Sequence, residues 1–469
     1  MLFSEPPFFV FFVGYFALQL IVPPRYRIWL IIVGSTVFYS WWRLDYVWLP
    51  FALTTIVWTG VWSMTRASDP RQRKLRLIAT ICVLFAPLAI VKYAYFLTHD
   101  VLGLVPVIAA ATGDASVLKF ALPLGISFVT FTLTAYVVDT YTRRYQGDSR
   151  FSTLLGYVLF FPHLIAGPIL RPNELMSQLR AKRRAMDARF ALGIALFTLG
   201  LVKKLVFADT IGEVVDPVFK PGAVASGWEY LLAFYGFSMQ IYCDFSGYTD
   251  MAIGLAYLLR IRLPTNFLRP YISASPVEFW RRWHITLSHW LRDYLYIPLG
   301  GNRLGQARQA ANLMITMVLG GLWHGANWSF LLWGFIHGTG LTLSHLAKGP
   351  MQRAGIAVPH WLAVVLTFHF VSIAWIYFRA PDLAVAHHVL VAPFTASWGN
   401  VGDFVSRNLF ALLLLAIFLL THRYDRHARL RLALRSANMG VVSAIIICLW
   451  ILAITVRQGS SAKFIYFDF

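Results

Sequence analysis

Charged side chains are scarce in this sequence of 469 residues: they make up 13% of it, whereas hydrophobic residues make up 58%. A soluble domain carries about 25% charged residues, so the composition argues against a soluble protein. Cysteines are also few, and Cys82, Cys243 and Cys448 all lie in apolar runs. This excludes a metal cluster, argues against a disulfide framework and predicts core packing. The serine motif G-x-S-x-G, the zinc motif H-E-x-x-H and the Walker loop are absent as well.

Acidic residues are half as numerous as basic ones, with 21 Asp and Glu against 41 Lys and Arg and a net charge of +20. In a soluble protein this excess would suggest nucleic acid. Here the basic residues lie in short loops between apolar runs, for example at 66–76 and 423–435. Because cytoplasmic loops collect Lys and Arg, the charge predicts orientation in the inner membrane instead of nucleic-acid binding. We expect both termini on the extracytoplasmic side.

Long apolar runs dominate the chain. A spanning helix needs about 20 apolar residues, and a large β-barrel would show short alternating segments, which are absent. The pattern predicts an all-α polytopic membrane protein with roughly ten to twelve crossings, in one domain over residues 1–469. The runs are 6–22, 27–42, 46–63, 77–96, 118–141, 190–208, 228–259, 326–346, 360–378, 408–421 and 438–456.

The segment FFPHLIAGPILRP, residues 160–172, interrupts this pattern. Pro168 and its neighbouring proline and glycine residues prevent a regular helix. Irregular backbone at membrane depth is tolerated only where protein buries it or water reaches it. We expect a re-entrant segment that lines a cavity; the alternative is a surface loop with apolar anchors.

The segment QIYCDFSGYTDMAIGLA, residues 240–256, places Asp244 and Asp250 inside an apolar run. An ionisable side chain in a span is costly and usually faces a cavity or a partner. Asp244 and Tyr248 are four residues apart and share a helix face, whereas the two aspartates lie on different faces. Both aspartates are candidates for lining a tunnel; the alternative is a structural role in bonds to neighbouring helices.

The segment SPVEFWRRWHITLSHWLRDYLYIPLGGNR, residues 275–303, has the pattern of one amphipathic helix in the membrane interface. At 100° per residue, its tryptophans and leucines share an arc with His284. The opposite arc carries Arg282, His289 and Asp293. A helix that only floats at the interface does not need a polar His284 on its buried face; the alternative is a histidine satisfied by a backbone carbonyl.

The segment GLWHGANWSF, residues 321–330, places His324 and Asn327 in an apolar run. A helix from 310 to 323 rises about 20 Å, short of the roughly 30 Å hydrocarbon, so His324 is expected deep in the membrane. The flanking glycines would let the helix break or a substrate pass close, beside the apolar wall of Trp323. For His324 alone, the alternative is a core histidine.

A neutral histidine is the usual general base near pH 7. In an apolar tunnel, His324 would take a proton from a hydroxyl that attacks an activated acyl group. His284 or Asn327 would donate to the developing oxyanion. Without a nucleophile motif, the acyl group must arrive as a thioester, and we expect no bound cofactor and no metal.

These four segments together resemble the membrane-bound O-acyltransferase (MBOAT) family, most closely its bacterial branch of alginate O-acetyltransferase and related polysaccharide O-acetylation proteins. The resemblance covers most of the chain, with the motif core at about 150–340. It implies a helical fold with re-entrant and interfacial helices around a transmembrane tunnel. The signature histidine of the family matches His324 in LWHG, and its second motif position matches His284.

The resemblance implies acetyl transfer from acetyl-CoA or an acyl carrier protein to an extracytoplasmic polysaccharide, often through a separate periplasmic acetyltransferase. Alginate, cellulose, another exopolysaccharide and peptidoglycan all remain open as acceptors. A branch that D-alanylates teichoic acids shares the core, so transfer of another acyl group to a cell-wall polymer is an alternative. A polysaccharide or small-molecule transporter is a further alternative, but transporters often show matched broken helices in two repeats. Here the breaks occur once.

The tail, residues 457–469, ends in KFIYFDF, which resembles the ends of the polysaccharide-acetylating branch and the companion peptide of the D-alanylating system; it has Asp468 where that pattern has Gln. An apolar end facing water is unfavourable, so we expect the tail to fold back into the tunnel. Tyr466 is then a candidate to carry the acyl group as a tyrosyl ester; the alternative is a packing tail.

The basic residues of 275–303 form a possible surface for an acidic donor, either the phosphates of coenzyme A or a carrier protein. The alternative is contact with anionic lipid headgroups. The residues are Arg281, Arg282 and Arg292.

Overall fold

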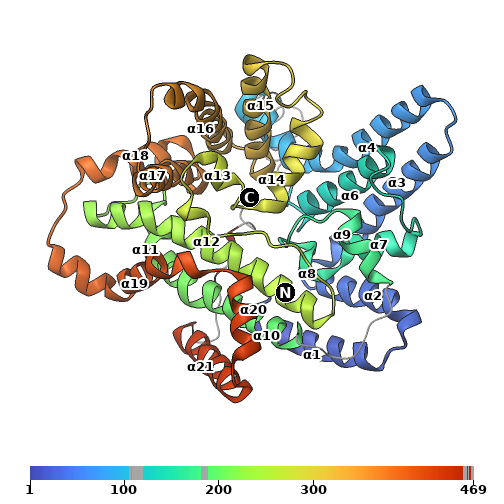
Figure 1. Cartoon of the computed structure of the whole chain (residues 1–469), viewed down its shortest axis with the longest axis horizontal. Helices are drawn as coiled ribbons and strands as arrows, with labels where there is room; N and C mark the ends of the chain where they lie inside the picture. Colours follow the sequence, from blue (N-terminus) through green and yellow to red (C-terminus); the bar gives the residue numbers. More distant parts are fainter. Residues whose placement is uncertain (105–106, 108–119, 181–188, 458–461, 463, 466–469) are drawn as a thin grey trace. The chain divides into compact units, whose positions relative to one another are not determined.

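The computed structural model describes residues 1–104, 107, 120–180, 189–457, 462, 464 and 465. Within these residues the regular structure is entirely helical, which confirms the predicted all-α class (Figure 1). The chain divides into two compact units. Unit 1 comprises residues 1–190 and 255–264, and unit 2 comprises residues 191–254 and 265–469. A single acyltransferase domain over the whole chain stays a prediction.

The helices of unit 1 range from the 4 residues of α8 to the 27 residues of α4, and α3 and α4 pack along each other. Its helices are α1 (Pro6–Ile21), α2 (Arg27–Ser40), α3 (Trp48–Thr65), α4 (Pro70–Phe96), α6 (Ile126–Tyr141), α7 (Phe151–Leu159), α8 (Phe161–Leu164) and α9 (Pro172–Leu179).

The predicted irregular segment lies in this unit. Residues 160–170 are all buried, and their backbone is irregular except for the single helical turn α8. The Tyr157 hydroxyl donates to the carbonyl of Leu170 (2.7 Å), which satisfies a backbone group that no helix serves. Pro168 is buried within this segment, so the surface-loop alternative is wrong.

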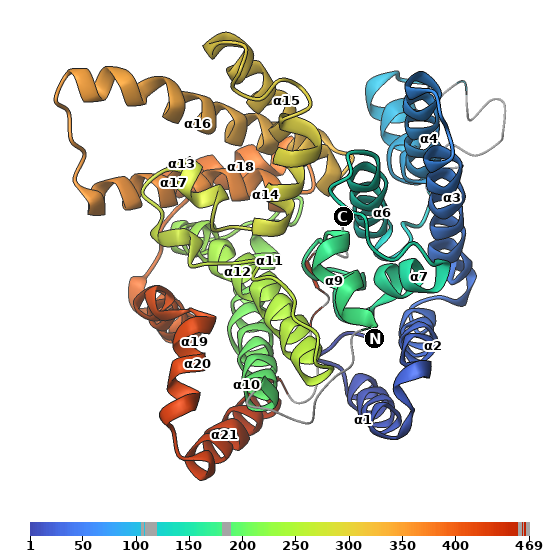
Figure 2. The ribbon, with the colours of Figure 1, turned by 45° about the vertical axis from the view of Figure 1, so that its right-hand side comes forward.

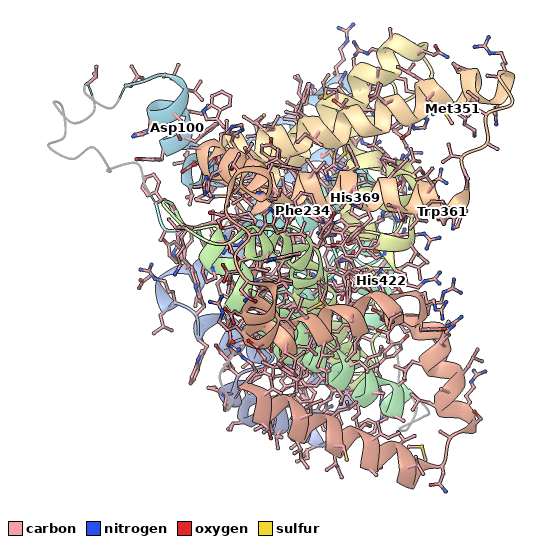
Figure 3. The ribbon with its side chains drawn as sticks, turned by 90° about the vertical axis from the view of Figure 1, so that its left-hand side faces the viewer. Asp100, Phe234, Met351, Trp361, His369 and His422 are labelled. Carbon is pink, nitrogen blue, oxygen red and sulfur yellow. The ribbon has the colours of Figure 1, made fainter. Side chains whose placement is uncertain are left out.

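Unit 2 carries the remaining helices, except for residues 189–190 of α10 and 255–258 of α12, which belong to unit 1. Within unit 2, α15 and α16 form a closely packed hairpin (Figure 2). Figure 3 labels Met351 near the end of α16 and Trp361 near the start of α17. The helices are α10 (Arg189–Val202), α11 (Asp209–Val218), α12 (Gly227–Leu258), α13 (Pro276–Trp280), α14 (Ile285–Leu291), α15 (Gln306–His324), α16 (Trp328–Arg353), α17 (His360–Arg379), α18 (Leu383–Thr395), α19 (Val401–Thr421), α20 (His427–Ser436) and α21 (Met439–Arg457).

Six helical stretches in the described residues are long and apolar enough to cross a membrane. This is fewer than the ten to twelve crossings predicted, and some of the other apolar runs fold into shorter helices such as α2, which has 14 residues. The prediction that the cysteines pack in the core is confirmed for Cys243, which is buried, and is wrong for Cys82 and Cys448, which are exposed. The six stretches are Leu44–Thr65, Pro70–Val101, Phe190–Val218, His360–Arg379, Val401–Tyr424 and Met439–Arg457.

The prediction of one continuous helix over 275–303 is wrong. The chain forms α13, breaks, and continues as α14 and the π-helical turn Arg292–Tyr296. At the break, His284 adopts a left-handed backbone conformation with φ 40° and ψ 55°. Asn266 replaces the missing helical bonds: its carbonyl accepts from Ile285 N–H (2.9 Å) and its side-chain oxygen from Thr286 N–H (3.1 Å). A partner this distant in sequence is invisible to helical periodicity.

Candidate active site

The α15–α16 hairpin places Trp323 and His324 at the last turn of α15. Its glycines permit close helix contact: a Cβ on Gly321 would lie 2.2 Å from the carbonyl oxygen of Phe330, and one on Gly334 would lie 2.4 Å from that of Met317. The expectation that Gly321 loosens the backbone for a substrate therefore gives way to a packing role. Gly325 does end the helix, with an extended backbone.

Asn327 is the N-cap of α16. Its side-chain oxygen accepts from Ser329 N–H (3.0 Å), and its amide nitrogen donates to the carbonyl of Pro381 (2.6 Å). A cap of this kind contributes about 1 kcal/mol to helix stability. These bonds give Asn327 a structural role that the sequence pattern did not indicate.

His324 is buried in an aromatic environment. Its ring centre lies 4.9 Å from that of Trp323, and 5.1 Å from those of Trp333 and Phe378, in each case edge to face. Only 4% of its surface is exposed. Its rotamer is thus fixed by large side chains from α16 and α17, as a general base requires if it is to hold one orientation.

His284 lies in the same unit and is fully buried at the break between α13 and α14. Its ring packs edge to face against Phe245 (centres 4.7 Å apart) and lies 6.3 Å from Trp323. Trp323 therefore lies near both histidine rings.

Neither ring nitrogen of His284 has a hydrogen-bond partner within the described residues. A buried polar atom without a partner costs about 1–3 kcal/mol, and so does a residue held in a sparsely populated backbone conformation. The alternative of a backbone carbonyl partner is limited to the residue's own backbone. Burial lowers the pKa of His284 to about 3, which keeps the ring neutral, with one donor and one acceptor nitrogen.

Asp250 belongs to a polar cluster centred on Lys203. The ammonium of Lys203 contacts Asp250 (2.7 Å) and Asp425 (2.6 Å), and His427 lies 2.7 Å from the other oxygen of Asp250. The Tyr242 hydroxyl donates to Asp425 (2.6 Å), beside His422, which is labelled in Figure 3. This cluster borders a cavity of about 460 Å³ between α10 and α19.

Asp244 belongs to a second cluster, centred on Lys204. The ammonium of Lys204 contacts Asp244 (2.7 Å) and Asp209 (2.8 Å). The two aspartates of α12 thus face different partners, as their spacing predicted, and both bind neighbouring elements through ion pairs. The structural reading of these aspartates is supported, and their place in a tunnel stays a prediction.

Lys203 and Lys204 were missed by the sequence reasoning, although a signal was available. Two consecutive ammonium groups inside the apolar run 190–208 are as anomalous as the aspartates in 240–256. Which carboxylates the two lysines bind depends on backbone geometry, because residues 203–208 form a π-helix. Such turns are frequent at functional sites.

The described part of the tail packs into unit 2, and its place in a tunnel stays a prediction. Phe464 is 1% exposed and stacks on Tyr248, with ring centres 4.9 Å apart. The backbone N–H of Ile465 donates to Asp244 (2.8 Å). The shared face of Asp244 and Tyr248 therefore faces the tail. Tyr466 and Asp468 lie outside the described residues.

The predicted basic surface is partly neutralised. Arg282 pairs with Glu278 (2.5 Å), and Arg292 pairs with Asp293 (2.7 Å). Asp293 is itself buried, contrary to its predicted position on the polar arc. Arg281 is exposed and has no ion pair in the described chain.

Residues 145–381, which hold both histidines, match the model of the membrane-bound O-acyltransferase family. The chain belongs to this family. It is an O-acyltransferase and a multi-pass membrane protein. The chain is 37% identical over 426 residues to the probable alginate O-acetylase AlgI of Azotobacter vinelandii, covering 89% of this chain and 83% of that protein.

Two further relatives cover most of the chain. The probable alginate O-acetylase AlgI of Pseudomonas aeruginosa is 38% identical over 457 residues, covering 95% of this chain and 86% of that protein. The peptidoglycan O-acetyltransferase of Helicobacter pylori is 35% identical over 426 residues, covering 83% of this chain and 79% of that protein. Each alignment covers more than four fifths of this chain.

Proposed function

We propose that this membrane-bound O-acyltransferase moves an acetyl group from a cytoplasmic thioester towards hydroxyls of an extracytoplasmic polysaccharide, in the inner membrane and with both termini outside the cytoplasm. The observation that carries the proposal is the pair of buried histidines, His284 and His324, which both lie near Trp323. The alginate O-acetylase and peptidoglycan O-acetyltransferase relatives support acetyl as the group and a polymer as the acceptor.

In the proposed reaction, His324 accepts the proton of an attacking hydroxyl while the hydroxyl oxygen bonds to the thioester carbonyl carbon. The carbon–sulfur bond then breaks, and the thiolate takes the proton back from the imidazolium. The products are an acetyl ester and a free thiol. A neutral His284 has a ring N–H that can donate to the transient oxyanion, and its buried, partnerless nitrogens support this assignment. The donor is acetyl-CoA or an acyl carrier protein, and a periplasmic acetyltransferase is the expected partner.

Tyr466 is proposed as an intermediate carrier of the acetyl group. Its unperturbed pKa of about 10 makes the phenol a poor nucleophile alone, so a histidine must accept its proton during attack. Two described neighbours support the proposal. Phe464 packs 5.8 Å from Phe245, whose ring contacts His284, and Ile465 is bonded to Asp244.

The test is the acetyl content of the surface polymer in a strain that lacks this chain. We expect acetyl ester to disappear while polymer is still exported, and to return with the wild-type chain. Loss of exported polymer would instead favour the transporter alternative. Labelled acetyl-CoA and labelled acetyl carrier protein, supplied separately to membrane vesicles, distinguish the two donors.

A further inference from the structure

Two carboxylates and one ammonium form a compact ionic group beside the tail. Asp209 and Asp244 each use one oxygen to contact Lys204, at 2.8 Å and 2.7 Å. The side chains of the three residues are 2%, 1% and 5% exposed, in the same order. Arg457 adds a second cation 4.0 Å from Asp209. Buried carboxylates persist only when they are paired in this way.

The other oxygen of each carboxylate accepts a backbone N–H from the tail. Ala462 N–H donates to Asp209 Oδ2 (3.1 Å), and Ile465 N–H donates to Asp244 Oδ2 (2.8 Å). Phe464 is buried between these two bonds and stacks on Tyr248. Hydrogen bonds from a neutral donor to an ionised acceptor are stronger than neutral ones.

A π-helix makes the arrangement possible. Lys204 and Asp209 are five residues apart, and in an α-helix such residues lie on different faces. Residues 203–208 form a π-helix, in which hydrogen bonds join residues five apart, and Asp209 N–H donates to the Lys204 carbonyl. The side chains of Lys204 and Asp209 therefore meet, and Asp244 on α12 completes the group.

We propose that Asp209, Lys204 and Asp244 form a clasp that anchors the C-terminal tail at Ala462 and Ile465 and thereby supports acyl transfer. The clasp binds backbone N–H groups, at positions three residues apart, and therefore does not distinguish one side chain from another. Selectivity for this tail sequence comes from Phe464, whose ring lies in an aromatic pocket. The members are positioning residues. This inference rests on the proposed function only in its last step, the transfer.

The group also borders a cavity of about 350 Å³, whose lining includes Lys204, Asp209, Asp244, Ala462 and Ile465. Water can therefore reach the tail bonds once they open, and exchange of these amide hydrogens reports directly on the clasp.

The experiment measures amide hydrogen exchange in the C-terminal peptide of the full-length protein in detergent micelles. In Asp244→Ala, which removes the acceptor, we expect about tenfold faster exchange, the loss expected for one charge-assisted hydrogen bond. Asp244→Asn keeps an oxygen acceptor without the charge and is expected to give an intermediate rate. It also preserves shape, so it stays informative if the alanine variant fails to fold. In Asp244→Asn, kcat should fall while KM for the thioester stays constant.

The matched controls are Asp250→Ala and Asp250→Asn, on the same helix and paired with the adjacent Lys203. These variants should leave exchange in the tail peptide unchanged. Unchanged tail exchange in both Asp244 variants, or an equal rise in the Asp250 variants, would overturn the clasp. Because exchange needs no acyl donor, this result is read independently of transfer. If the wild-type chain transfers no acetyl group, the proposed function fails and the clasp is still decided.

Discussion

Lys203 and Lys204 are consecutive residues, yet their ammonium groups hold two separate pairs of carboxylates. Lys203 contacts Asp250 and Asp425, and Lys204 contacts Asp209 and Asp244. Neighbouring residues of a helix point to different faces, so one turn of chain joins two ionic groups that tie different elements of unit 2 together.

Removing a lysine ammonium group should lower the free energy of unfolding most where the paired carboxylates are least exposed. Lys204→Met leaves two carboxylates that are 1–2% exposed, and we expect a loss of about 3–5 kcal/mol. Lys203→Met should cost roughly half as much, since Asp425 is 25% exposed and can be hydrated. Thermal unfolding in micelles measures both. Arg43→Met, at a surface pair, is the control and should change stability by less than about 1 kcal/mol. Equal losses for the two lysine variants would contradict this ranking.

Loss of the proposed base should abolish transfer and leave the fold intact. His324→Ala should lower acetyl transfer by about 10²–10⁴-fold, the usual contribution of general base catalysis. His345→Ala removes an exposed histidine from α16 and serves as the control. Acetyl ester on the polymer is quantified after both proteins are shown to reach the membrane in equal amounts. Near wild-type acetylation by His324→Ala would remove this residue from the mechanism.

The buried His284 should make stability depend on pH. Burial lowers its pKa to about 3, so between that value and its unfolded pKa of about 6.5 the unfolded chain binds a proton that the folded chain does not. Stability is therefore fully present above about pH 6.5 and falls as the pH drops. Between pH 7.5 and pH 5, wild type should lose about 2 kcal/mol more than His284→Asn, which cannot titrate. Identical pH profiles of unfolding in the two proteins would show that His284 is not held neutral.

Position 284 can also be separated from its neighbour on α14. His284→Ala should reduce acetyl transfer strongly, because the ring is buried beside Trp323, whereas His289→Ala should retain most of it, because His289 is exposed. Because the helix breaks at His284, the expected difference rests on burial and not on helical phase. Initial rates with a saturating donor test it, and equal losses would contradict it.

Much of the candidate site could be predicted because the sequence places polar side chains in apolar runs, where hydrocarbon makes them costly. His324, His284 and Asp244 stand out in apolar runs, and the shared face of Asp244 and Tyr248 follows from their spacing. Other features depend on partners distant in sequence. The break at His284 needs Asn266, and the capping role of Asn327 needs Pro381.

The remaining features depend on local backbone geometry that residue spacing does not reveal. A five-residue spacing in an apolar run carries no helical signal for a Lys–Asp pair, so the π-helix that joins Lys204 to Asp209 could not be inferred. The described residues contain six candidate spans, fewer than the ten to twelve crossings predicted. Apolar composition reports burial, and protein can bury a short helix as well as lipid can.

The unpaired Arg281 should contribute to donor capture more than the paired Arg282. Arg281→Glu is expected to raise KM for an acidic donor several-fold at low salt, and the effect should shrink towards 1 M salt, where the screening length is about 3 Å. Arg282→Glu disturbs a residue already paired with Glu278 and also places two acids together, so its folding must be checked first. A change in KM that does not depend on salt would contradict electrostatic attraction. Binding to anionic vesicles, measured on the same variants, tests the lipid alternative.

Tyr466 offers the sharpest test of how the acetyl group travels. Tyr466→Phe keeps the aromatic ring and removes only the hydroxyl, so the tail bonds of Ala462 and Ile465 to the two aspartates should persist. If the phenol carries the acyl group, transfer to the polymer should fall by at least about 10²-fold, because a covalent step has lost its nucleophile. Mass spectrometry of the wild-type tail peptide, after incubation with labelled donor and acid quench, should show one added acetyl group that the Phe variant lacks. Tyr424→Phe, at an exposed tyrosine, controls for loss of a hydroxyl elsewhere. Wild-type transfer by Tyr466→Phe would leave direct passage from thioester to acceptor, with His324 as base and the clasped tail as packing.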